Sequence, residues 1–184
     1  ALVNSNVYVA NSQISNNLVG CVSICGGDLT LVHNTIAQFY RFSESGTGYS
    51  FDVSNSLNGI PYPVTNLDVR NCLITGWKDS ELSIDRNDTV DMKYHFCECI
   101  IRNPEITDST KQYFDNITWE DPKDTISYGL KNFVRIPTKG NDYLYDFHLA
   151  PASKANGTAN PEWALPLNRE GLPRDEKSMN IGCY

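Results

Sequence analysis

The sequence predicts an all-β fold in which short parallel strands stack into a β-solenoid. Three observations lead to this prediction: strand-like alternation with almost no helical stripe, a repeated eight-residue pattern, and a spacing between copies that starts near one solenoid turn. Stretches such as "NVYVANSQISNN" and "GDLTLVHNTIAQF" alternate apolar and polar residues, as strands do. The one segment that favours a short helix lies near Asp108 to Phe114.

The eight-residue pattern occurs four times, with apolar residues at positions one, three and eight and a polar residue at position five. The copies begin at Val7, Leu29, Leu67 and Tyr94, which are 22, 38 and 27 residues apart. One solenoid turn needs about two dozen residues, and longer steps leave the extra residues as loops. A doubly wound α/β fold would need a helix between parallel strands, and the shortest step has no room for one.

Stacked copies place equivalent side chains in inward columns. The four predicted columns are Val7–Leu29–Leu67–Tyr94, Val9–Leu31–Val69–Phe96, Ser12–Asn34–Cys72–Cys99 and Ile14–Ile36–Ile74–Ile101. Alternation stops at position five, Asn71 in the third copy, so we expect a corner there, because Asn tolerates left-handed backbone. A further strand at residues 49–55 would separate Leu31 from Val69 and stays open as an alternative.

The "NxxI" that follows each alternating strand resembles the repeat of right-handed parallel β-helices. The stretch from Tyr145 to Tyr184 resembles the carboxyl-terminal segment of secreted and surface β-helix proteins of Bacteroidetes. The matching residues are Leu149, Pro151, Ser153, Ala155, Gly171, Pro173, Arg174, Ile181, Gly182 and Tyr184, whereas Lys154 replaces a usual Pro and Asn180 a usual Asp. The resemblance implies about five to six β-helix turns. It also implies an extracellular or outer-membrane location, with a lipid anchor upstream of this chain.

We expect one domain, with β-helix turns in residues 1–144, insertions at about 38–66 and 103–144, and a cap of the same domain in residues 145–184. The cap, with Trp163, Leu165 and Leu167, is expected to fold over the last strand, whose open edge would otherwise invite aggregation. Nothing like a cap precedes Val7. We therefore expect the chain to be the carboxyl-terminal part of a longer protein, or a partner to cover the first turn.

Charge and hydropathy restrict the partners. The 15 Lys and Arg residues against 22 Asp and Glu residues give a net charge of −7. A duplex nucleic acid needs a basic surface and is excluded as a partner. No apolar run is long enough for a transmembrane segment. The expected partners are a polysaccharide or another surface glycan, with outer-membrane transport proteins as a further candidate.

The best catalytic candidates are the outward residues Asp68 and His95, with Arg70 beside them. A carboxylate, an imidazole and a guanidinium on an exposed sheet could abstract a proton from a uronic acid, the chemistry of β-helix polysaccharide lyases. The alternative is a solvated cross-strand charge pair. We expect the charge pair, because the sequence shows no cleft that would perturb these groups.

Aromatic residues of the two insertions are candidate ligand-binding residues. These are Tyr49 and Tyr62 in the first insertion and Tyr113, Trp119 and Tyr128 in the second. Aromatic rings stack on sugars or anchor protein interfaces. The alternative is that they pack the loops onto the solenoid.

Six cysteines, Cys21, Cys25, Cys72, Cys97, Cys99 and Cys183, leave the disulfide connectivity open. Cys72 and Cys99 share a column and are expected as stacked thiols, with a disulfide between adjacent turns as the alternative. No CxxC pair occurs, so we expect no metal site. The segment "DRNDTVD" lacks the Gly and Glu of a calcium loop, so no cofactor is expected and calcium stays the alternative.

The resulting hypothesis is a non-catalytic surface module that binds glycan or docks on an outer-membrane nutrient-uptake complex. Aromatic insertions, an acidic composition and the absence of a compact catalytic motif favour it. The alternatives are a polysaccharide lyase or glycoside hydrolase that acts on an acidic polysaccharide, and a structural spacer.

Overall fold

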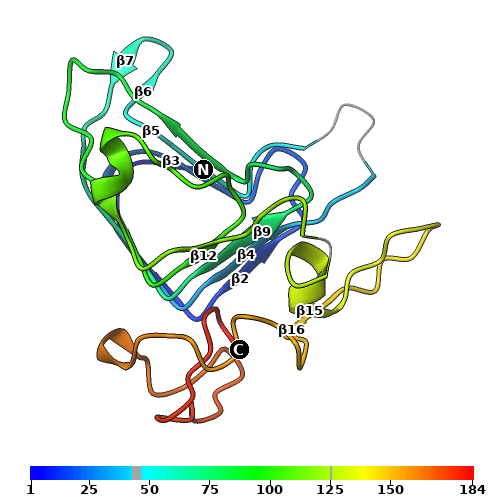
Figure 1. Cartoon of the computed structure of the whole chain (residues 1–184). Helices are drawn as coiled ribbons and strands as arrows, with labels where there is room; N and C mark the ends of the chain where they lie inside the picture. The colour runs from blue at the N-terminus through cyan, green and yellow to red at the C-terminus, as the bar shows by residue number, and fades with distance from the viewer. Residues whose placement is uncertain (43–46, 125) are drawn as a thin grey trace.

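The computed structural model describes residues 1–42, 47–124 and 126–184. The chain is all-β, and its two larger sheets are parallel and curl around a common interior (Figure 1). The larger sheet contains β1 (Leu2–Ala10), β3 (Val22–Val32), β5 (Phe51–Ser54), β8 (Val64–Arg70), β10 (Leu82–Asp85), β11 (His95–Cys97) and β13 (Phe114–Asp115). The second sheet contains β2 (Gln13–Ser15), β4 (Thr35–Gln38), β9 (Leu73–Gly76), β12 (Ile100–Ile101) and β14 (Thr118–Trp119).

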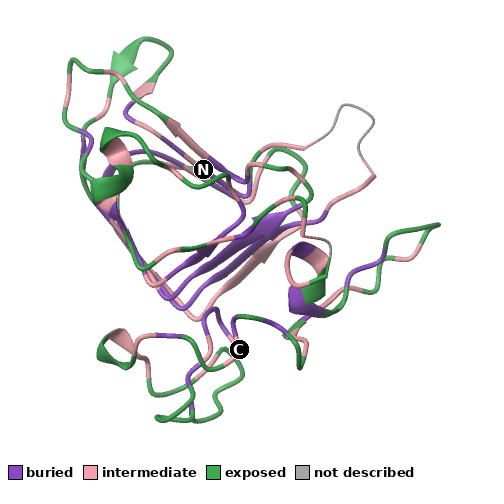
Figure 2. Ribbon diagram, viewed as in Figure 1, coloured by how far each residue is buried: buried purple, intermediate pink, exposed green. Residues whose placement is uncertain are grey.

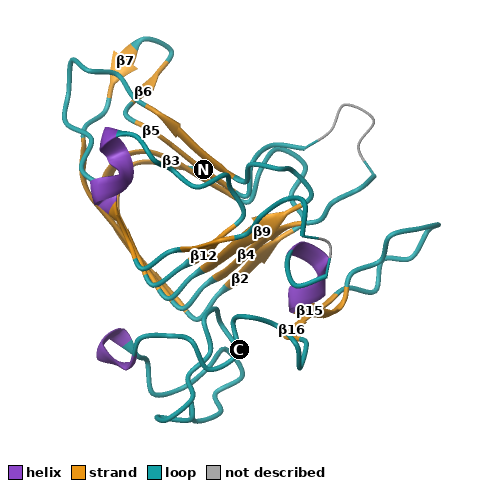
Figure 3. Cartoon of the chain, in the orientation of Figure 1, coloured by secondary structure: helices purple, strands orange, loops and turns teal. Residues whose placement is uncertain are grey.

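The remaining elements are small and lie outside these two sheets (Figure 3). Two antiparallel pairs are formed by β6 (Ser56–Leu57) with β7 (Ile60–Pro61) and by β15 (Phe133–Arg135) with β16 (Asp146–Leu149). The described residues also form three 3₁₀ helices, η1 (Ser109–Tyr113), η2 (Gly129–Asn132) and η3 (Pro161–Trp163). The first of them is the short helix expected near Asp108, whose side chain caps it. Of the described helices, none is long and apolar enough to span a bilayer.

The strand register confirms two of the predicted columns in full, and the column that begins at Val7 as far as Leu67. Val9, Leu31, Val69 and Phe96 are successive partners in the larger sheet. In the second sheet, the members of the isoleucine column, Ile14–Ile36–Ile74–Ile101, are likewise successive register partners. Except for the partly exposed Val9 and Ile14 at one end, these side chains are buried, and Figure 2 shows the buried face turned inward. Each buried Leu, Ile, Val or Phe stabilises the fold by about 1.5–3 kcal/mol.

The third column joins neighbouring copies through side chains. The backbone N–H of Ser12 donates to Asn34 Oδ1 at 3.0 Å, and that of Asn34 to Cys72 Sγ at 3.4 Å. The Cys72 N–H donates in turn to Cys99 Sγ at 3.4 Å. All six cysteines are free, so Cys72 and Cys99 are stacked thiols and the disulfide alternative is wrong in this structure.

The long strand β3 has different partners along its two halves. Its first half pairs with β5, from Val22–Phe51 onward, and its second half pairs directly with β8, including Leu31 with Val69. The alternative of a strand between Leu31 and Val69 is therefore wrong. The halves meet at Gly27, where a Cβ atom would lie 2.2 Å from the carbonyl oxygen of Ser5, so this close approach requires glycine.

A fifth copy of the repeat lies inside the expected insertion at residues 103–144. Phe114 pairs with Phe96, and Trp119 pairs with Ile101. The sequence pattern missed this copy because its first position is the polar Gln112 and its step from Phe96 is only 18 residues. The expectation of one continuous insertion is thus wrong for residues 114–119.

Left-handed backbone marks position five of all five copies. The residues and their φ angles are Asn11 at 46°, His33 at 52°, Asn71 at 50°, Glu98 at 52° and Asn116 at 51°. The N–H groups of the first four corners still bond to the next copy, as in Asn71 to Cys97 O at 3.2 Å. Asn and His adopt this conformation more readily than most residues. The corner predicted at Asn71 is confirmed.

Residues 145–184 lie alongside the row of corners, which differs from the expected cap over the last strand (Figure 1). Asn71 holds this tail with both side-chain atoms, since its Oδ1 accepts from Asn160 N and its Nδ2 donates to Asn160 O, each at 2.9 Å. The tail follows this path because it covers apolar residues on the outer face of the second sheet. Its exposed side would otherwise present Leu73 and Ile100 to water, and the tail buries them against a second apolar cluster that contains Phe147.

His33 is buried at the junction of corner and tail. Its Nδ1 lies 3.2 Å from Gly182 O, and its Nε2 lies 3.2 Å from Asn71 Nδ2. These partners assign a neutral ring that donates from Nδ1 and accepts at Nε2. Burial, together with the nearby Arg174 guanidinium, lowers the pKa of His33 to about 4.

We predict that Asn71→Ala lowers the free energy of unfolding by about 3 kcal/mol, because alanine is strained at left-handed φ and leaves Asn160 without its partners. Asn116→Ala is the matched control, at a corner that is exposed. The free energy of unfolding of this variant should fall by only about 1 kcal/mol, the cost of alanine in left-handed backbone. Urea unfolding measures both values, and equal losses would contradict the role of the Asn71 side chain.

The low pKa of His33 predicts a pH dependence of stability. The unfolded chain binds a proton at His33 below about pH 6.5 and the folded chain only below about 4, so stability should fall as the pH drops through that window, by about 3 kcal/mol. His33→Asn, which places the residue of three other corners here, should remove this component. Urea unfolding of both proteins between pH 7 and pH 4 tests it, and identical slopes would rule it out.

Candidate functional site

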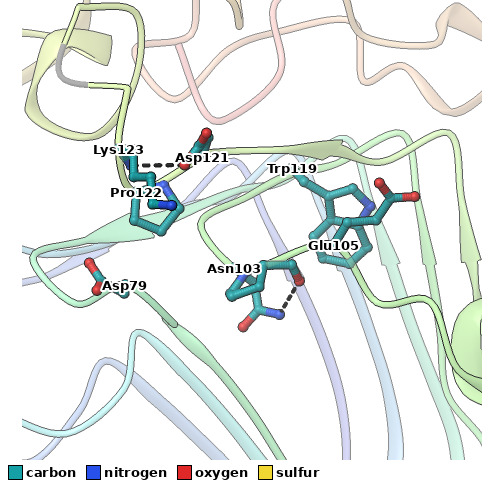
Figure 4. Close-up of a pocket in the computed structure, with 8 residues that line it drawn as sticks. Asp79, Asn103, Glu105, Trp119, Asp121, Pro122 and Lys123 are labelled. Atoms are coloured by element: carbon teal, nitrogen blue, oxygen red, sulfur yellow. Dashed lines mark hydrogen bonds between the residues drawn. The ribbon is translucent and has the colours of Figure 1, made fainter.

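A cavity of about 570 Å³ lies where the last strands of the second sheet end. It is lined by Asp79, Asn103, Pro104, Glu105, Trp119, Asp121, Pro122 and Lys123 (Figure 4). Small-molecule sites in proteins span about 300–1,000 Å³, so the size suits a ligand of a few rings. The view shows Trp119 and Glu105 toward one end, Pro122 and Lys123 toward the other, and Asn103 between them.

The sheet brings these residues together from separate segments. Asp79 follows β9, Asn103 follows β12, and Asp121 follows β14. The parallel pairing continues beyond the strands, because Glu120 N donates to Ile101 O at 2.8 Å. The loops that leave neighbouring strands therefore leave at one edge of the sheet, and a rigid scaffold of this kind commonly carries its binding residues on such loops.

Trp119 has two roles in this geometry. It continues the isoleucine column as the partner of Ile101, and its ring centroid lies 5.4 Å from that of Phe114. It is nevertheless only half-buried and lines the cavity. One part of the indole thus covers the end of the core while another part faces the cavity.

A buried carboxylate fixes the segment that carries Trp119 and Asp121. Glu120 lies between them with no exposed surface. Its oxygens accept from Thr75 Oγ1 at 2.7 Å, Asn132 Nδ2 at 2.5 Å and Gly129 N at 3.3 Å. Burial raises the pKa of Glu120, and these hydrogen bonds oppose that rise. The network holds the wall of the cavity in place, as a preorganised site requires.

The cavity carries more negative than positive groups. The carboxylates are those of Asp79, Glu105 and Asp121, against the ammonium group of Lys123. Asp121 Oδ1 accepts from the backbone N–H of Lys123 at 2.8 Å, and Glu105 lies 3.2 Å from Lys111 Nζ. Within the described part of the chain, no cluster of three or more His, Cys, Asp or Glu side chains could hold a metal ion. That finding covers the segment 85–91, where Asp88 pairs with Arg86 at 2.8 Å.

The predicted catalytic residues are brought together but are engaged with other partners. Asp68 and His95 are register partners on β8 and β11, as expected. Asp68, however, accepts a two-point ion pair from Arg70, which includes Arg70 Nε to Asp68 Oδ1 at 2.8 Å. His95 Nε2 instead lies 2.8 Å from Asp115. The pair of Asp68 with Arg70 lies within β8, whereas the contact of His95 with Asp115 joins β11 to β13. Both lie away from the cavity lining, and a catalytic role stays a prediction.

The predicted aromatic residues do not converge on one site. Tyr49 lies under Lys78 Nζ at 4.3 Å, Tyr62 packs against Gly26, and Tyr113 lies 4.9 Å from Tyr94. Tyr128 immediately precedes η2 and is half-buried. Of the five, Trp119 is the one that lines the cavity. The other four lie outside it, and of these Tyr49 and Tyr113 line two separate cavities.

Sequence reasoning did not bring Asp79, Asn103, Glu105 and Asp121 together in one ligand site. A usable signal existed for two of them, because Asn103 and Asp121 each stand five residues after a corner, at Glu98 and Asn116. Equal distances from equivalent corners would have placed them side by side. This inference requires that the fifth copy, which contains the corner at Asn116, is recognised first. Asp79 and Glu105 lie in loops of unequal length and carry no such signal.

Comparisons of the chain with protein-family models, with curated proteins and with solved structures gave no match.

We predict that Glu120→Gln lowers the free energy of unfolding by about 2 kcal/mol, although the two side chains have the same shape. The amide group would place N–H donors against the donors of Asn132, Thr75 or Gly129. Glu105→Gln is the exposed control in the same cavity and should change stability by less than about 0.5 kcal/mol. Thermal and urea unfolding check both, and an equally small effect of Glu120→Gln would contradict the assigned network.

Proposed function

We propose that the chain is a right-handed parallel β-helix that acts as a non-catalytic glycan-binding module, with the sugar in the Trp119 cavity. The in-register columns and the five left-handed corners support the β-helix. The observation that carries the binding role is a half-buried indole that faces an open cavity among amide and carboxylate groups. A location on the cell surface, and docking to outer-membrane transport proteins, belong to the same proposal and rest on the resemblance of the tail.

The chemistry of the cavity suits a pyranose ring. The apolar C–H face of a sugar packs on an aromatic ring, and its hydroxyl groups need acceptors such as carboxylate and amide oxygens. The cavity supplies Trp119 for the face and Asp79, Asn103 and Asp121 for the hydroxyl groups. Pro104 and Pro122 add apolar walls of low conformational entropy.

The contacts of Asp68 and His95 on the larger sheet support a non-catalytic role. A general base must be free to take a proton from the substrate, and Asp68 is held by Arg70. His95 has one ring nitrogen bound to Asp115 and lies outside the lining of the cavity. The stack of Arg70 over the Trp163 ring, 4.8 Å from its centroid, holds the guanidinium against the tail. Asp68 is thus engaged in a structural contact, and His95 lies apart from the candidate binding cavity.

We predict that the protein binds one or more members of a panel of neutral, amino and uronic oligosaccharides, and that Trp119→Ala weakens this binding by about 10-fold, the loss of one stacking contact. Trp119→Phe, which keeps a ring against Phe114, should retain most of the affinity. Tyr8→Ala removes an aromatic ring that is 61% exposed on β1 and should leave binding unchanged. Calorimetric titration measures the affinities, and the melting temperature controls for folding.

Two outcomes would contradict the proposal. One is no binding to any oligosaccharide of the panel. The other is the release of unsaturated products from an acidic polysaccharide, followed by absorbance and abolished by His95→Ala. The second outcome would establish the lyase alternative.

A further inference from the structure

The charge of the cavity lining distinguishes between acidic and cationic sugars. Its lining presents the carboxylates of Asp79, Glu105 and Asp121 and a single ammonium group, that of Lys123. The whole chain has the same sign, with a net charge of −7. A uronic acid would bring a further negative charge into this surrounding, whereas a cationic sugar would be attracted both locally and at long range.

The contacts already made by these carboxylates leave capacity for a cation. The partner of Asp121 Oδ1 is a neutral backbone amide, the N–H of Lys123, so the charge of Asp121 is not neutralised by that bond. Glu105 does have a cationic neighbour, Lys111 Nζ at 3.2 Å, and its side chain is still 54% exposed. Asp79 is exposed in the loop that follows β9. An ammonium group in the cavity could therefore form charge-assisted hydrogen bonds, which are stronger than neutral ones.

Trp119 adds a second reason for a cation. The face of an indole ring attracts an ammonium group electrostatically, in addition to packing against the C–H face of a pyranose. The amine of an amino sugar is attached directly to the ring that would pack on Trp119. Ring packing and charge recognition are thus compatible in one small ligand.

Resting on the proposed glycan-binding role, the geometry points to a protonated amino sugar as the ligand class. Its ring packs on Trp119, and its ammonium group pairs with one of the carboxylates that line the cavity, those of Asp79, Glu105 and Asp121. The buried Glu120 network keeps Trp119 and Asp121 at a fixed separation, so the site is formed before the sugar arrives.

The test compares a glucosamine tetramer with its fully N-acetylated counterpart, which carries neutral acetamido groups in place of the ammonium groups, by calorimetric titration in mildly acidic buffer. The glucosamine tetramer should bind at least 10-fold more tightly at low salt, and the difference should shrink as salt screens the charges. Asp79→Asn combined with Asp121→Asn should reduce the difference to below threefold. Asp88→Asn combined with Asp91→Asn removes an equal charge from side chains that are 89% and 67% exposed and outside the cavity lining, and it should leave the difference intact.

The outcomes separate this inference from the proposed function. Binding of the N-acetylated tetramer with equal or higher affinity, lost in Trp119→Ala, would overturn the inference and keep the glycan-binding role. A preference for glucosamine that survives the double Asp variant would also overturn the inference, because the charge recognition would then lie elsewhere. If neither tetramer nor any other oligosaccharide binds, both proposals fail.

Discussion

The left-handed residue at each corner is the constraint on which the rest of the structure depends. In an extended strand side chains alternate, so residues an odd number of positions apart face opposite sides. In the third copy, positions one and three differ in parity from positions six and eight, yet Leu67, Val69, Cys72 and Ile74 all face the interior. One residue in left-handed conformation at position five, such as Asn71, turns the chain and resets the parity. Without it, half of the apolar residues would face water.

The same corners also determine where the tail and the cavity lie. On the outside of the corner row, Asn71 and His33 offer side-chain groups that bind the backbone of Asn160 and Gly182, so residues 145–184 pack beside the sheets. At the far edge of the second sheet, the loops that leave β9, β12 and β14 surround the cavity. Trp119 occupies the last position of an inward column, and this is why one residue both closes the core and lines the candidate site.

Much of the core could be predicted from sequence, because stacked copies impose the same residue type at equivalent positions. The isoleucine column and the corner at Asn71 follow from that requirement alone. The fifth copy was missed because Gln112 stands at its first position, within a 3₁₀ helix. The path of the tail was missed because it depends on the outer faces of Leu73 and Ile100, which a pattern of inward positions does not address. The cavity was missed for a related reason, since loop residues such as Asp79 and Glu105 meet only after the register of their strands is known.

The central claim is that each copy stacks in register on the next around one shared interior. Nuclear Overhauser contacts between isoleucine methyl groups test it most directly, in protein with labelled methyl groups. The account predicts contacts for Ile14 with Ile36, Ile36 with Ile74, and Ile74 with Ile101, because these are successive register partners. It predicts none between Ile14 and Ile74, which are two strands apart. A direct contact between Ile14 and Ile74, or the absence of the three successive contacts in folded protein, would contradict it.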